Sequence, residues 1–143
     1  MNRELSARVT LWVNRALIVL LVALPFLIPA MLRRWSMGPE DALALTTAFH
    51  CCLPVVLFAL VTIDKLIRNI LNREVFTFGN VRLIRRVQWC CVGVSVICLP
   101  SAFVYLPLMC MVVVMGFLAL VVSVVKCVMA TAVELREEND LTV

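Results

Sequence analysis

The longest uncharged stretch of this chain limits its fold more than any other feature. From Val87 to Val125, 39 consecutive residues carry no Asp, Glu, Lys or Arg. A helix needs about 20 residues to cross the hydrocarbon core of a bilayer, so this stretch is long enough for two crossings. It contains Pro100 and Pro107, each of which lacks a backbone N–H and disfavours helix at the preceding residue. We therefore expect two membrane spans here, separated near residues 101–106.

Two further uncharged stretches, Ala16–Leu32 and Ala42–Ile63, predict two more spans. The composition agrees, because 15% of the residues are charged, whereas soluble domains carry about 25%. The sequence predicts one all-α domain, residues 1–143, with four transmembrane helices arranged as two hairpins. The predicted spans cover residues 10–32, 43–66, 82–100 and 107–130.

Basic residues near the ends of the spans predict the orientation, because Lys and Arg are retained on the cytoplasmic side of a membrane. Four crossings place both termini and the middle loop on one side. Eleven basic residues fall on that side: Arg3, Arg8, Arg15, Lys65, Arg68, Arg73, Arg82, Arg85, Arg86, Lys126 and Arg136. Arg33 and Arg34 fall on the other side. We therefore expect both termini to be cytoplasmic.

The middle loop contains a helix start, in the segment "VFTFGN" followed by Val81. Thr77 suits the N-cap position, where its hydroxyl would accept the backbone N–H of Asn80. Phe76 precedes the cap and would pack against Val81 as a hydrophobic staple. The sequence therefore predicts that the third helix begins here.

Arg82, Arg85 and Arg86 follow at a spacing that places them on one helix face. Such a face can dock a partner or anionic lipid at the membrane surface. The simpler interpretation is that these arginines only fix the topology. Both interpretations stay open at the level of sequence.

Two segments, "LIRNILNREVFTFGNVRLIRRVQW" and the terminal "LREENDLTV", carry a family resemblance. The chain resembles the bacterial four-helix membrane family catalogued as domain of unknown function 2975. The matching positions are Val75, Phe76, Thr77, Asn80, Val81, Asp140, Leu141, Thr142 and Val143. Arg73-Glu74 and Phe78-Gly79 depart from the pattern of many relatives. The resemblance implies a bacterial inner-membrane protein of unassigned activity, and a helix-turn-helix transcription regulator as partner, since relatives are often encoded beside one.

The two matching segments are short, prone to β structure and expected on the cytoplasmic side. We expect Glu74–Thr77 and Asp140–Val143 to pair as strands in a small cytoplasmic cap. Three glutamates spaced on one helix face precede the second segment and would face the three arginines: Glu134, Glu137 and Glu138. The arginines and glutamates together form the predicted partner-binding surface.

Seven cysteines and a single histidine raise the alternative of a metal site. No C-x-x-C spacing is present, and buried cysteine ordinarily acts as a small hydrophobic residue. His50 lies at a depth similar to that of Ser95, to which it could hydrogen-bond. A Cu(I) site at the same depth would use soft sulfur ligands beside the imidazole: His50, Cys51, Cys98, Met111 and Met115.

No catalytic motif is present, so we expect neither enzymatic activity nor a cofactor. We expect an interaction or regulatory protein that lies in the lipid bilayer and makes no direct contact with nucleic acid. A small transporter or metal-handling protein that uses His50 is the alternative. Small residues at helix-packing spacing are sparse, which leaves oligomerisation open.

Overall fold

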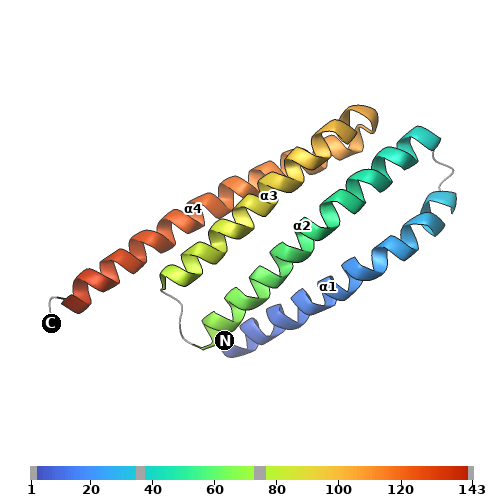
Figure 1. Ribbon diagram of the computed structural model, residues 1–143. Coiled ribbons are helices and arrows are strands. Elements are labelled where there is room, and N and C mark those ends of the chain that lie inside the picture. The colour runs from blue at the N-terminus through green and yellow to red at the C-terminus, as the bar shows by residue number, and fades with distance from the viewer. Residues whose placement is uncertain (1–2, 35–37, 73–76, 142–143) are drawn as a thin grey trace.

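The computed structural model describes residues 3–34, 38–72 and 77–141 (Figure 1). They form four helices: α1 (Arg3–Arg34), α2 (Pro39–Leu71), α3 (Phe78–Val104) and α4 (Pro107–Leu141). No strand occurs within these ranges. Each helix contains a segment long and apolar enough to cross a membrane. The predicted all-α class is confirmed, and each of the four predicted spans falls within one helix.

Local sequence accounts for where α2 begins and ends. Pro39 occupies the first turn of α2, where a missing N–H leaves no hydrogen bond unmade. Glu40 and Asp41 follow in that turn, and Arg68 lies in the last turn, so the charges at both ends complement the helix dipole.

The turn between α3 and α4 is shorter than the sequence predicts. Pro107 begins α4 as expected, but α3 continues through Pro100 to Val104. The prediction that Pro100 would end the helix is wrong. A proline inside a membrane helix is tolerated where neighbouring groups satisfy the freed backbone, so the chain reverses only at Tyr105 and Leu106.

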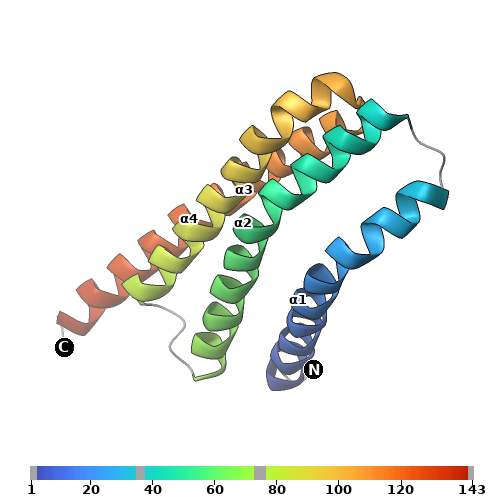
Figure 2. The same ribbon diagram turned by 45° about the vertical axis from the view of Figure 1, so that its right-hand side comes forward.

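Helices that follow one another in the sequence run in opposite directions and pack side by side (Figure 1). The α3–α4 contact is the most extensive, whereas α1 packs against α2 and makes no comparable contact with α3 or α4. Figure 2 shows α1 bent part way along its length, and Pro25 and Pro29 lie in its second half. Proline is the usual cause of such a bend, because it removes a helix hydrogen bond.

Small residues fill the contacts between the helices. A buried stripe on α3 repeats every four residues through Cys90, Val94, Cys98 and Ala102. Gly93, on the same helix, lies close to Val55 of α2. Membrane helices pack closely where side chains are small, so Cys90 and Cys98 join Gly93 and Ala102 as the small residues on this side of α3.

The cytoplasmic strand pair is not supported by the described residues. Asp140 and Leu141 belong to α4 and are therefore helical, so the predicted strand over 140–143 is wrong for these two positions. The preceding glutamates and arginine are good helix formers, which favours continuation of α4. Val75, Phe76, Thr142 and Val143 lie outside the described residues.

Candidate functional site

A groove between α3 and α4 holds three cationic side chains, Arg82, Arg85 and Lys126. Its volume is about 510 Å³, and Phe78 and Val81 contribute to its apolar walls. Apolar walls reduce access to water, which strengthens the attraction of the cations for an anionic group. None of the described residues that line this groove is a carboxylate.

Lys126 of α4 is held in place by Gln88 of α3, which is not one of the residues that line the groove. Its Nζ donates a hydrogen bond to Oε1 of Gln88, at 3.1 Å. Gln88 is neutral, so this bond fixes the position of Lys126 without pairing it with an acidic side chain. Of the three predicted arginines, Arg82 and Arg85 line the groove, whereas Arg86 is exposed outside it.

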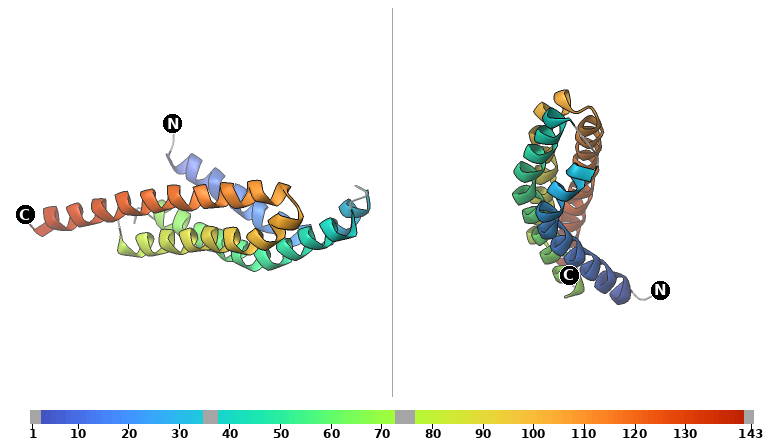
Figure 3. Two further views of the ribbon diagram at one scale, coloured as in Figure 1. Left: turned by 90° about the horizontal axis from the view of Figure 1, so that it is seen from above. Right: turned by 90° about the vertical axis from the view of Figure 1, so that its right-hand side faces the viewer.

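The acidic end of α4 lies beyond the basic residues instead of facing them. Arg82 and Arg85 are level with Lys126 and Ala130, with which they share the groove. At 1.5 Å per residue, residues 134–138 begin about 6 Å further along the axis of α4 than Ala130 and end about 12 Å beyond it. Figure 3 shows this end of α4 extending past the start of α3. The structure therefore does not bring the predicted acidic and basic sets face to face.

The exposed end of α4 begins sharply after Val133, which is only 3% exposed. From residue 134 to residue 141, every residue whose burial is described is exposed. Leu135 and Leu141 are included, at 60% and 87% exposure. This segment carries four acidic residues and one basic residue, so it is an acidic helix end with two exposed leucines.

Asn80, from the segment that carries the family resemblance, joins α2 to α3. Its side chain is fully buried, and its Oδ1 accepts a hydrogen bond of 2.8 Å from Nδ2 of Asn69 in α2. A buried amide that is satisfied in this way fixes the relative position of the two helices. The sequence places Asn80 only in the cap of the third helix. The partner of its side chain, Asn69, lies on a different helix and cannot be identified from the local sequence.

Thr77 occupies the N-cap of α3 with an extended backbone, as predicted, but its hydroxyl makes no capping hydrogen bond. The backbone N–H of Asn80 bonds instead to the Thr77 carbonyl, at 3.0 Å. The predicted hydroxyl cap is therefore wrong, since the main chain already supplies the acceptor. Phe76, the other half of the predicted staple, lies outside the described residues.

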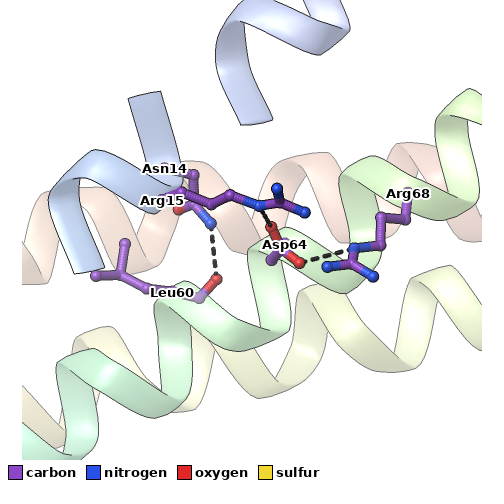
Figure 4. Close-up of polar contacts among 5 residues, drawn as sticks. All are labelled: Asn14, Arg15, Leu60, Asp64 and Arg68. Atoms are coloured by element: carbon purple, nitrogen blue, oxygen red, sulfur yellow. Dashed lines mark hydrogen bonds and ion pairs between the residues drawn. The ribbon is translucent and has the colours of Figure 1, made fainter. Parts of the chain in front are cut away.

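Polar side chains attach α1 to α2 near one end of the two helices (Figure 4). Nδ2 of Asn14 donates to the carbonyl oxygen of Leu60, at 3.1 Å. Asp64 lies between two arginines, at 3.8 Å from Nε of Arg15 and 2.9 Å from Nε of Arg68. Its Oδ1 is buried and has no hydrogen-bond partner among the described residues, so Arg15 balances its charge without bonding to it directly.

This α1–α2 contact was missed from the sequence, where Arg15 served only as a topology signal. Asn14 is the one buried residue of α1 among those whose burial is described. A signal was present, because Asp64 is an acidic residue at the end of an otherwise apolar segment, and polar groups at that depth are usually paired. Its partner helix could not be identified without the structure.

The predicted metal ligands divide into two groups. His50 is exposed, and its Nδ1–H donates to the Thr46 carbonyl of its own helix, at 2.8 Å. Cys51 is also exposed. The expected bond from His50 to Ser95 is absent, since the Ser95 hydroxyl donates to the carbonyl of Val112, at 3.1 Å.

Cys52, which the sequence interpretation passed over, lies inside the protein where Cys51 was expected. Its Sγ is 3.5 Å from Sγ of Cys98, and both side chains are buried. Met111 and Met115 line the same apolar cavity as this pair, which has a volume of about 220 Å³ and is lined from all four helices. Of the predicted sulfur ligands, the structure thus brings Cys98, Met111 and Met115 to one cavity and leaves Cys51 outside it, together with His50.

Four helices, each long and apolar enough to cross a membrane, define an all-helical, multi-pass membrane protein. Comparison of the sequence with known families assigns the protein to one of them. The chain belongs to the family described as "Protein of unknown function (DUF2975)", whose profile matches residues 16–143. The resemblance seen in the sequence is therefore confirmed, and the match includes both segments that carry it. No curated protein and no solved structure matches the chain.

Proposed function

We propose that this protein is a membrane-anchored regulatory protein of the bacterial inner membrane whose cytoplasmic surface binds a soluble partner. The observation that carries the proposal is the exposed acidic end of α4 beside the cationic groove. In the predicted orientation, both features lie on the cytoplasmic side, where a soluble protein can reach them.

The charges of the two features specify the chemistry of the partner. The acidic end of α4 suits a basic surface, and a DNA-binding protein carries such a surface in order to contact phosphates. A helix-turn-helix regulator held there would be kept from DNA, because the same basic residues cannot pair with glutamates and phosphates at once. The exposed Leu135 and Leu141 add apolar contact area that charge alone does not supply.

The groove supplies a second point of attachment. An acidic side chain of the partner would enter between Arg82, Arg85 and Lys126, where the apolar walls favour pairing over hydration. Two contacts of opposite sign orient the partner, because a reversed approach brings like charges together.

A binding measurement tests the proposal with the helix-turn-helix regulator encoded nearest to this gene. The full-length protein is reconstituted in nanodiscs and titrated with the purified regulator. Glu134→Lys with Glu137→Lys should weaken binding by about tenfold or more, since close charge pairs across an interface couple by about 1.5 kcal/mol or more. Arg86→Ala, an exposed arginine outside the groove, is the matched control and should change binding little. Equal binding by the wild type and the double glutamate variant would refute the acidic helix end as the dock.

A further inference from the structure

Sulfur-bearing side chains from three different helices pack together in the interior of this protein. Cys52 of α2 and Cys98 of α3 place their sulfur atoms 3.5 Å apart, and Met115 of α4 packs against the same buried cluster. We propose that Cys52, Cys98 and Met115 bind one soft monovalent cation of the Cu(I) class. The proposal stands apart from the proposed function, since the two depend on different residues.

The chemistry of the donors selects the class of ion. Thiolate and thioether sulfur are ligands preferred by Cu(I) among the common metal ions of proteins. Zinc prefers four ligands from thiolate, imidazole and carboxylate groups. Among the described residues, no group of three or more His, Cys, Asp or Glu side chains could hold such an ion.

The spacing of the sulfur atoms favours three-coordination. With metal–sulfur bonds of about 2.3 Å, as in zinc thiolates, two ligands lie about 4 Å apart in a trigonal site and about 4.6 Å apart in a linear one. The observed 3.5 Å is nearer to the trigonal value. Small rotations about the two Cα–Cβ bonds would supply the difference, and the third position then falls to Met115.

The apolar surroundings limit the net charge of the site. Cys98 is six residues, or about 9 Å, from the end of α3, and an unbalanced charge inside a bilayer is costly. Cysteine binds a metal as the thiolate, so one Cu(I) ion replaces two thiol protons, which are released to water, and forms two metal–thiolate bonds. The Met115 thioether coordinates as a neutral donor, so the ion lowers the charge of the thiolate pair from two negative charges to one.

The neighbouring cavity gives the site room to form. It measures about 220 Å³ and is lined almost entirely by apolar atoms. Met111 also lines it, but is 48% exposed and is not part of the cluster around the cysteine pair. Met115 is therefore the third ligand, and Met111 serves as its control.

Silver(I) is a suitable probe, because it has the same charge and softness but does not change oxidation state. The full-length protein in nanodiscs is loaded with Ag(I) under reducing, thiol-free conditions, and bound metal is counted by mass spectrometry after desalting against a competing ligand. We expect one tightly held Ag(I) ion per chain and two protons released per ion. Cys52→Ala and Cys98→Ala should lose this ion, whereas Cys51→Ala should keep it.

Met115→Leu keeps the volume of the side chain and should preserve the fold. It should weaken Ag(I) binding on the order of tenfold, as loss of even an outer partner of a metal site does. Met111→Leu should leave the affinity unchanged. Retention of the ion by both cysteine variants, or equal affinities of the two methionine variants, would overturn the proposal.

Discussion

The hydrogen bond between Asn69 and Asn80 allows a quantitative test of how α2 is held against α3. Replacing Asn80 by Ala removes a side chain that is fully buried and leaves Nδ2 of Asn69 without its acceptor. The lost bond costs about 1 kcal/mol, and an unsatisfied, partly buried donor costs a further 1–2 kcal/mol. We therefore expect Asn80→Ala to lower the free energy of unfolding by about 2–3 kcal/mol.

Asn69→Ala should also cost about 2–3 kcal/mol, because it removes the same bond and leaves Oδ1 of the fully buried Asn80 without this donor. The double variant should show a coupling energy of about 0.6–1.7 kcal/mol, between the average and the largest value that double-mutant cycles give for hydrogen bonds between membrane helices. Each free energy is measured by reversible unfolding in mixed micelles with increasing dodecyl sulfate, followed by tryptophan fluorescence.

Asn72→Ala is the matched control, since Asn72 is exposed at the end of α2. It should change stability by no more than about 0.5 kcal/mol. The reasoning would be refuted if Asn80→Ala cost no more than this control, or if the effects of Asn69→Ala and Asn80→Ala were simply additive.

Three further predictions follow from the other contacts. Asp64→Asn removes the charge that pairs with Arg15 and Arg68, and should destabilise the α1–α2 contact by about 1–2 kcal/mol. We expect faster proteolysis of α1 in this variant. An unchanged rate of proteolysis would count against that contact. An impermeant maleimide added to intact cells should label Gly38→Cys and not Glu134→Cys, and the reverse pattern would invert the topology. His50→Phe should leave the free energy of unfolding within about 0.5 kcal/mol of the wild type. The imidazole is exposed, and its hydrogen bond is to Thr46 of the same helix. A larger loss of stability would place the His50 side chain in the interior.

The start of α3 shows which structural features the local sequence can predict. Thr77 was placed correctly at the N-cap, because cap positions depend on a few adjacent residues. The predicted bond from the Asn80 backbone N–H to the Thr77 hydroxyl is wrong, because the Thr77 carbonyl accepts it. The side chain of Asn80 bonds to Asn69 on another helix, which local sequence does not predict. Nothing in the local pattern distinguishes an amide that caps its own helix from one that bonds across to a neighbour.

The adjacent residues Cys51 and Cys52 show that the sequence of an apolar helix does not indicate which of its side chains face the interior. Successive residues of a helix point about 100° apart, so one faces the interior and the other the lipid. In soluble proteins, a polar face would indicate which is which. Here the segment around them is apolar on every side, so the sequence offers no such signal and His50 was placed on the inner face instead of Cys52.

The sequence by itself determined that this chain has four apolar helices, because the intervals between charged residues are local and a charge in hydrocarbon is costly. Matching residues in the middle loop and at the carboxyl end also established the family. Tertiary packing alone decided which side chains meet. The rotation of each helix about its axis is fixed by contacts with its neighbours, and those contacts join Asp64 to Arg15, Asn80 to Asn69 and Cys52 to Cys98.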